Sequence, residues 1–212
     1  SQVGAFFAAP YLNEVIDIAP DLGYKHWYPC ARPRDLLSGP IGKTRAGQKV
    51  LYASRLTSWL NTKMFAELAG HLGGAMYGKS YNDDTIMTMR VLSEVHNFDL
   101  IEGVFDRAAI DLTGFGYFWD CAGTPTKPFY KKRISLSAWE SLKMGLVPIV
   151  FADQCPDYLT DICVQIPRNA DLATMLSCID QYEINASTNL SKFNRAMKEE
   201  SIYSMVCHQI SE

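Results

Sequence analysis

KVLYASRLTSWLNTKMFAELAGHLGGAMYG, residues 49–78, is the stretch that decides the fold. Its first six residues form an apolar run typical of a buried strand, and residues 74–78 predict a second short strand. Between them, residues 60–72 predict an amphipathic helix, because apolar side chains recur there with helical spacing: Met64, Phe65, Leu68, Ala69 and Leu72. A strand, a helix and another strand predict a βαβ unit with parallel strands.

The same alternation continues along the chain. Further strands are predicted at residues 98–101, 116–120, 147–152 and 162–166, and further helices at residues 83–96, 104–112, 135–144, 171–182 and 190–208. Gly145 stands directly after one of these helices, where glycine commonly ends a helix. We therefore predict an α/β fold built on a Rossmann-like, doubly wound parallel sheet.

The first 46 residues do not share this pattern. Short strand-like and helix-like runs lead into a segment rich in proline and glycine, residues 32–47. We predict that residues 1–46 are the end of a preceding domain plus a linker, and that residues 47–212 form the Rossmann-like domain.

Composition excludes several classes of protein. With 212 residues, 48% hydrophobic and 20% charged, the chain is neither disordered, nor collagen-like, nor a small disulfide-stapled scaffold. A net charge of −3 gives no general attraction to nucleic acid or anionic lipid. The apolar run at residues 3–10 is too short to span a bilayer and lacks the basic flank of a signal peptide. We expect no membrane span and a cytoplasmic location, the host cytoplasm if the protein is viral.

The pattern of cysteines and histidines predicts no metal site. The six cysteines (Cys30, Cys121, Cys155, Cys163, Cys178 and Cys207) form no C-x-x-C pair, which favours buried free thiols in a reducing compartment. The four histidines are scattered, and no two aspartates are separated by one position. No Walker A, G-x-S-x-G or H-E-x-x-H motif is present, and no G-x-G-x-x-G follows the first strand, which disfavours a dehydrogenase.

Two short stretches beside predicted strands are candidate binding loops. Ligands of an open parallel sheet bind at the carboxyl ends of its strands. Arg55 directly follows the first strand and can hold a phosphate bidentately, although a surface arginine explains it equally well. Gly114 and Gly116 allow a close backbone approach to a ligand, with a simple tight turn as the alternative.

A third candidate lies where a basic loop enters a helix. Lys132 and Arg133 precede Ser135 and Ser137, whose amides at a helix N-terminus favour an anion. Glu140 follows within the first turns of the same helix. The alternative is a capping box, in which Ser137 and Glu140 only satisfy backbone amides.

The stretch WESLKMGLVPIV, residues 139–150, resembles the E-A-x-x-x-G-x-P-V-V pattern in the C-terminal, donor-binding domain of GT-B retaining glycosyltransferases. In that family the glutamate, here Glu140, holds the ribose of a nucleotide-sugar donor. The arginine of the family's G-R-L motif, here Arg55, contacts the donor diphosphate. The resemblance implies a metal-independent hexosyltransferase of the EC 2.4 class with no cofactor. Its donor substrate would be a nucleoside-diphosphate sugar, and among these we expect a UDP-sugar.

Within GT-B, the closest pattern is that of the phage α-glucosyltransferases that modify hydroxymethylcytosine in DNA. Their R-T-T-T-W and S-G-F-G-Y are similar to residues 55–59 (RLTSW) and 113–117 (TGFGY), and their W-Y-P is similar to residues 27–29. This likeness implies a bacteriophage enzyme that modifies DNA, with DNA as the acceptor of the sugar. The family's Lys-Gly after the arginine motif is absent, and Lys63 replaces it only with a shifted helix start. Lys132 stands where the family has its first glutamate.

The resemblance covers roughly residues 25–150 and leaves out the N-terminal, acceptor-binding half of a GT-B enzyme. Either a missing N-terminal domain or a partner protein would then supply the acceptor side. The alternative function is a catalytically inactive module that kept this half-fold and binds a nucleotide or a partner.

Overall fold

The computed structural model describes residues 47–57, 61–103, 110–123, 135–143, 145–155 and 159–183. These residues contain a six-stranded sheet with the order β3-β2-β1-β4-β5-β6, in which every pair of neighbouring strands is parallel. The strands are β1 (Lys49–Ala53), β2 (Gly74–Gly78), β3 (Asp99–Glu102), β4 (Phe115–Trp119), β5 (Val147–Phe151) and β6 (Val164–Ile166). This order and direction confirm the predicted Rossmann-like, doubly wound sheet.

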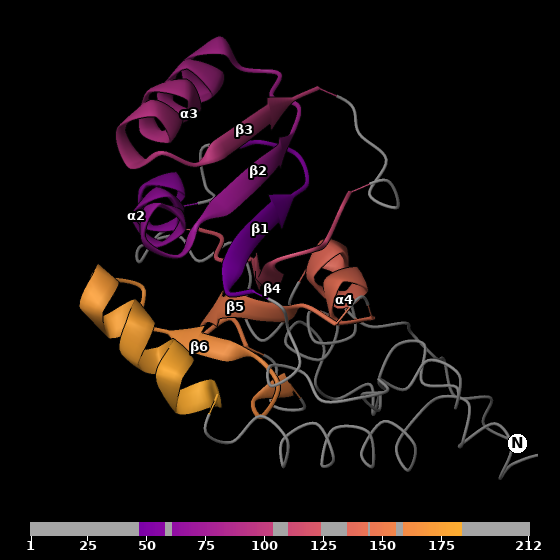
Figure 1. Ribbon diagram of the computed structural model, residues 1–212, viewed down its shortest axis with the longest axis vertical. Coiled ribbons are helices and arrows are strands. Elements are labelled where there is room, and N and C mark those ends of the chain that lie inside the picture. Colours follow the sequence, from indigo (N-terminus) through magenta and orange to yellow (C-terminus); the bar gives the residue numbers. More distant parts are fainter. Residues whose placement is uncertain are drawn as a thin grey trace, which may run out of the picture.

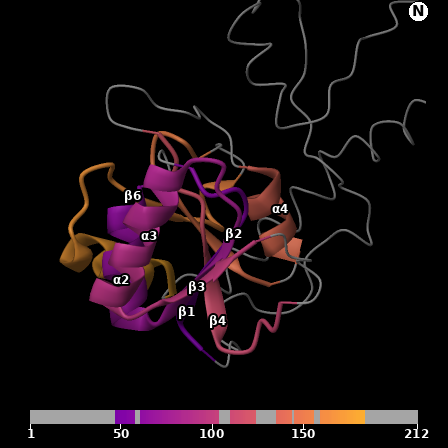
Figure 2. The same ribbon diagram turned by 90° about the horizontal axis from the view of Figure 1, so that it is seen from above.

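Helices cover both faces of this sheet. Figure 2 shows α2 (Thr62–Leu72) and α3 (Asp83–His96) on one face and α4 (Leu136–Lys143) on the other. A further helix, residues 172–183, lies on the same side as α2 and is drawn in orange in Figure 1. Two covered faces explain why the central strands are nearly continuous apolar runs rather than alternating ones.

The packing of α2 on the sheet follows its apolar face. Phe65 and Leu68 are fully buried, as their spacing predicts. The ring of Phe65 meets Phe98 edge-on at a centroid distance of 5.3 Å and Trp119 of β4 at 6.0 Å. Edge-to-face pairs of this kind are worth about 0.5–1.5 kcal/mol beyond the area that they bury.

The start of α2 differs from the prediction. The helix begins at Thr62 rather than Leu60, and Asn61 before it has a left-handed backbone with φ 51° and ψ 47°. A residue with that backbone cannot continue a right-handed helix toward the N-terminus, so Asn61 fixes where α2 begins.

The cap of α4 is Ser135 and not Ser137, so the Ser137 half of the alternative capping box is wrong, while the side chain of Glu140 is not among those described. The Oγ of Ser135 accepts a hydrogen bond from the Ala138 amide at 3.1 Å. At the other end Gly145 has φ +84° and donates its N–H to the carbonyl of Leu142 at 3.0 Å. The predicted glycine stop is therefore confirmed.

Some predicted elements lie outside the described residues: those of residues 1–46, residues 104–109 of a predicted helix, and the helix at 190–208. Residues 110–112, the described end of the helix predicted at 104–112, are not helical. The division at residue 46 stays a prediction.

The described cysteines are free thiols, as predicted: Cys121, Cys155 and Cys163 are buried and Cys178 is half-buried. None of the helices in the described ranges is long and apolar enough to cross a membrane. Those ranges also hold no cluster of three or more His, Cys, Asp or Glu side chains that could bind a metal ion.

The carboxyl ends of β1 and β2 are tied together closely. The amides of Ser54 and Leu56 donate to the carbonyls of Tyr77 and Lys79, both at 3.1 Å, so the pairing runs beyond the end of β1. Gly78 makes this possible, because a Cβ at that position would lie 2.1 Å from the carbonyl oxygen of Ser54. The backbone around Arg55 is thereby held against its neighbour.

We expect the Gly78→Ala variant to lose about 1–3 kcal/mol of unfolding free energy, because the added methyl group collides with backbone that cannot move aside alone. Urea denaturation followed by circular dichroism would measure the loss. Val91→Ala on the exposed side of α3 is the matched control, since surface substitutions usually stay within about 0.5 kcal/mol. Equal stability of the two variants would contradict the close approach.

Candidate functional site

The structure brings two of the three candidate stretches together at the carboxyl edge of the sheet. The Oγ of Ser137, in the first turn of α4, donates to the Oγ of Ser54 at 3.4 Å. Ser54 directly precedes Arg55, so the loop after β1 and the N-terminus of α4 lie side by side. Ser137 is only 8% exposed, which makes this contact part of the packed structure.

Arg55 lies at this edge with an exposed side chain. Its carbonyl accepts a short hydrogen bond, 2.6 Å, from the hydroxyl of Tyr52. Its guanidinium carbon is 5.8 Å from the ring centroid of Tyr81, and the Nζ of Lys79 is 5.1 Å from the same centroid. A fixed backbone and an exposed side chain leave the guanidinium able to bind an anion, with a second cation nearby.

A buried carboxylate already occupies the N-terminus of α4. Asp120, which follows β4 and is 7% exposed, accepts the amide of Ser135 at 2.9 Å. The amide group of Gln154 donates to the carbonyl of Asp120 at 2.7 Å and to its carboxylate at 3.3 Å. The positive end of the helix dipole stabilises this negative charge. An external anion that binds at the N-terminus of α4 would lie beside the carboxylate of Asp120.

The two glycines of the second candidate stretch are not at this edge. Gly114 and Gly116 lie at the start of β4, which in a parallel sheet is the amino edge. Gly114 has φ +85°, and its carbonyl accepts the amide of Lys49 at 3.0 Å. Close approach there is between backbone segments, because a Cβ on Gly47 would lie 2.0 Å from the carbonyl oxygen of Gly114. Grouping Gly114 and Gly116 with the carboxyl-edge residues was wrong, since the stretch precedes a strand instead of following one.

The remaining candidates are only partly described. Lys132 and Arg133 lie outside the described residues. Glu140 is in α4, but its side chain is not among those described. Lys63 is exposed in the first turn of α2, which begins two residues later than predicted, and its role in binding stays a prediction.

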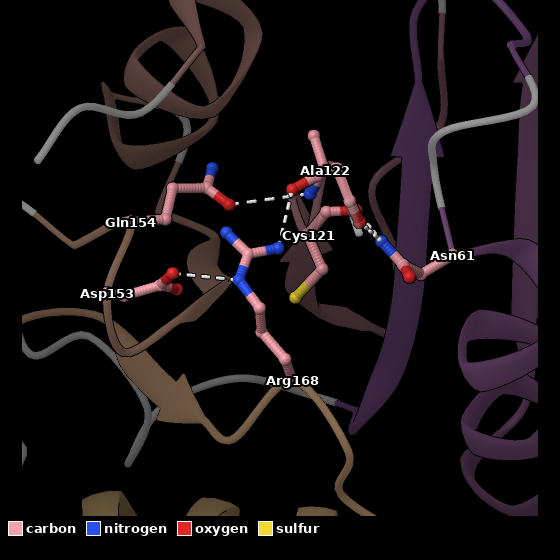
Figure 3. Close-up of polar contacts among 7 residues, drawn as sticks. Asn61, Cys121, Ala122, Asp153, Gln154 and Arg168 are labelled. Atoms are coloured by element: carbon pink, nitrogen blue, oxygen red, sulfur yellow. Dashed lines mark hydrogen bonds and ion pairs between the residues drawn. The ribbon is translucent and has the colours of Figure 1, made fainter. Parts of the chain in front are cut away.

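Sequence reasoning missed Asn61 and Arg168 at the same edge (Figure 3). The Nε of Arg168, after β6, donates to the carboxylate of Asp153 at 2.8 Å, and its Nη1 donates to the carbonyl of Ala122 at 3.1 Å. Its guanidinium carbon stacks 4.4 Å from the ring centroid of Phe151. The Arg168 side chain is 11% exposed, and its buried Nη2 has no hydrogen-bond partner within the described part of the chain.

A simple signal could have found some of these residues. Asp120, Gln154 and Arg168 each stand one to three residues after a strand, where polar side chains meet at the carboxyl edge. Asn61 has no such signal, because its side-chain contacts are with residues 60 and 62 positions away.

Two solved structures share this architecture. An α,α-trehalose-phosphate synthase (UDP-forming) from Burkholderia vietnamiensis superimposes with a TM-score of 0.51 at 10% identity, covering 78% of this chain and 45% of that one. AviGT4, a glycosyltransferase involved in avilamycin A biosynthesis, superimposes with a TM-score of 0.50 at 12% identity, covering 84% of this chain and 53% of that one. The predicted GT-B-type fold is thereby confirmed.

This chain spans about half the length of either solved structure. Its sequence matches no protein-family model and no curated protein sequence. At such low identity the structural likeness establishes the fold, and the function has to be argued from the residues at the carboxyl edge.

Burial raises the pKa of the Cys121 thiol well above its usual range, and the charge of Asp120 adds to the effect. A raised pKa leaves less thiolate at a given pH, so Cys121 reacts slowly with alkylating agents. In the folded protein at pH 8 we expect iodoacetamide to modify the half-buried Cys178 before the buried Cys121. Mass spectrometry of the two peptides over time would measure this order, and equal rates would contradict the burial of Cys121.

We expect Arg168→Met to lower the free energy of unfolding by about 1–3 kcal/mol, because the buried carbonyl of Ala122 loses its donor. Arg90→Met is the matched control. Arg90 also pairs with a carboxylate, that of Glu102, at 2.6 Å, but both side chains are well exposed. Exposed pairs of this kind add little to stability. Equal losses in urea denaturation would contradict a structural role for the Arg168 contacts.

Proposed function

We propose that this chain is the donor-binding part of a glycosyltransferase, which transfers a sugar from a nucleoside-diphosphate sugar to an acceptor. The observation that carries the proposal is the bond between Ser54 and Ser137. It places the loop of Arg55 against the first turn of the helix that contains Glu140, within a GT-B-type sheet. These are the two stretches whose sequences resemble the donor-binding motifs of that family.

In the proposed mechanism Arg55 binds the diphosphate. Lys132, Arg133 and Lys63 are the candidates for further cations around it. The bond between the sugar C1 and the diphosphate oxygen breaks, the acceptor oxygen bonds to C1, and a base takes the acceptor proton. Positive charge at the diphosphate stabilises the leaving group as its negative charge grows. Glu140 holds the ribose hydroxyls. We propose UDP as the nucleotide, and cationic side chains in place of a metal ion.

The acceptor side belongs to the other half of the enzyme in this proposal, either an N-terminal domain or a partner protein. That half also supplies the base, an aspartate or glutamate, that deprotonates the acceptor. DNA as the acceptor is the narrower proposal and rests on the likeness of residues 27–29, 55–59 and 113–117 alone. A net charge of −3 gives it no support.

One observation favours the alternative of an inactive module that binds a nucleotide or a partner. The carboxylate of Asp120 accepts a hydrogen bond from the amide of Ser135, at the helix terminus where a diphosphate would bind. Repulsion between this carboxylate and a diphosphate would weaken donor binding unless Arg55 and its neighbouring cations offset it.

Thermal unfolding with UDP, GDP, UDP-glucose, other nucleotide-sugars and NAD tests the proposal. A ligand at 100 times its dissociation constant adds about 2.7 kcal/mol, or roughly 5–10 °C in Tm for a domain of this size. We expect a shift with one nucleoside diphosphate that EDTA does not change. A flat response to all of them would contradict the donor site. Binding of the nucleotide-sugar without its turnover, in the presence of the acceptor half, would favour the inactive module.

Arg55→Ala should weaken binding of that nucleoside diphosphate by about tenfold or more, since a bidentate charge-assisted contact is lost. Isothermal titration calorimetry would give the dissociation constant. Arg90→Ala removes an exposed arginine on α3 and should leave the affinity unchanged. Equal affinity of the two variants would remove Arg55 from the phosphate site.

A further inference from the structure

Three consecutive backbone carbonyls in the loop after β4 are held by side chains from two other loops (Figure 3). The Nδ2 of Asn61 donates to the carbonyl of Cys121 at 3.2 Å and to that of Gly123 at 2.8 Å. The Nη1 of Arg168 donates to the carbonyl between them, that of Ala122, at 3.1 Å. Loop carbonyls usually face solvent, so three in a row bonded to side chains indicate a loop held in one conformation.

The two donors reach this loop from opposite sides. Asn61 lies at the start of α2, after β1, and Arg168 follows β6. In the sheet order, β1 and β6 lie on the two sides of β4. The amide of Ala122 also contacts the Oε1 of Gln154, at 3.4 Å. Among the described residues, Asn61 holds the loop after β4 from the β1 side.

The backbone of Asn61 suits this role. Its φ of 51° is in the left-handed region, which residues with a Cβ usually avoid and asparagine tolerates best. That conformation ends the loop after β1 and starts α2, while the side chain bonds across to the loop after β4. One residue thus joins the two loops that flank the proposed donor site.

These contacts also affect the electrostatics of the edge. A carbonyl oxygen that accepts an N–H bond has part of its negative charge offset by the donor. A diphosphate near Arg55 and α4 would meet less repulsion from the carbonyls of Cys121 and Gly123 than from unbonded ones.

We infer that Asn61 is a positioning residue of the donor site. It holds the loop after β4 against the loop of Arg55 and the start of α4, so that a nucleoside diphosphate meets a preformed edge. This inference rests on the proposed function. Arg168 holds the same loop from the far side.

The Asn61→Gly variant tests the inference, because glycine keeps the left-handed backbone and removes the side-chain bonds to Cys121 and Gly123. Asn97→Gly is the matched control. Asn97 has the same backbone conformation, with φ 55°, but at the C-terminal end of α3 and with an exposed side chain. Any general effect of glycine at a left-handed position appears in both variants.

Two measurements separate positioning from mere stability. In Asn61→Gly we expect the amides of Ala122 and Ser135 to exchange with deuterium about tenfold faster than in the wild type, because the loop opens locally. We expect the Kd for UDP, or for whichever diphosphate the wild type binds, to rise about five- to tenfold. Asn97→Gly should change neither the exchange nor the Kd.

The outcomes are distinct. If exchange and affinity are the same in both variants, the inference is overturned and the proposed function stands. If affinity falls while exchange stays at the wild-type rate, Asn61 contacts the ligand directly and the positioning role is overturned. If the wild type binds no nucleoside diphosphate, the proposed function and the donor-site role fall together. Should Asn61→Gly not fold, Asn61→Ala with Asn97→Ala as its control gives the same comparison, since alanine has no amide donor, adds no charge, and meets the same left-handed backbone at both positions.

Discussion

The side-by-side position of β1 and β4 is the constraint on which the rest of the structure depends. The chain builds β2 and β3 on one side of β1 and then returns to place β4 on the other side. This reversal leaves the carboxyl ends of β1 and β4 next to each other with their following loops diverging, which is where open parallel sheets bind ligands. The bond from Ser137 to Ser54 and those from Asn61 to Cys121 and Gly123 all cross this point.

Much of the fold could be predicted because local pattern and tertiary packing agree. Apolar runs mark β1, β2 and β5 within a residue, since these strands are buried on both faces. The exceptions have tertiary causes. Residues 60–72 predict a helix from Leu60, but α2 begins at Thr62, after the left-handed Asn61 whose side chain bonds to the carbonyls of Cys121 and Gly123. Such contacts, across 60 and 62 residues, leave no trace in the helix's own sequence.

The candidate site could be predicted only in part. Position after a strand was enough to select Arg55, and position at a helix start was enough to select Ser135 and Ser137. Residue type alone misplaced Gly114 and Gly116, because two glycines indicate close approach without saying to what. Asn61 and Arg168 act through backbone carbonyls far along the chain, and no spacing rule connects a side chain to such partners.

The hydrogen bonds of Gln154 limit which residues can replace it. Its amide is fully buried, with the oxygen toward the N–H of Ala122 and the nitrogen toward the carbonyl and carboxylate of Asp120. Only a neutral group that accepts on one side and donates on the other satisfies both neighbours. Glutamate at this position would place its carboxylate against that of Asp120. Leucine would leave the N–H of Ala122 and the oxygens of Asp120 without these hydrogen bonds. We therefore expect position 154 to require glutamine, because glutamate and leucine have a similar size but not its pair of one acceptor and one donor.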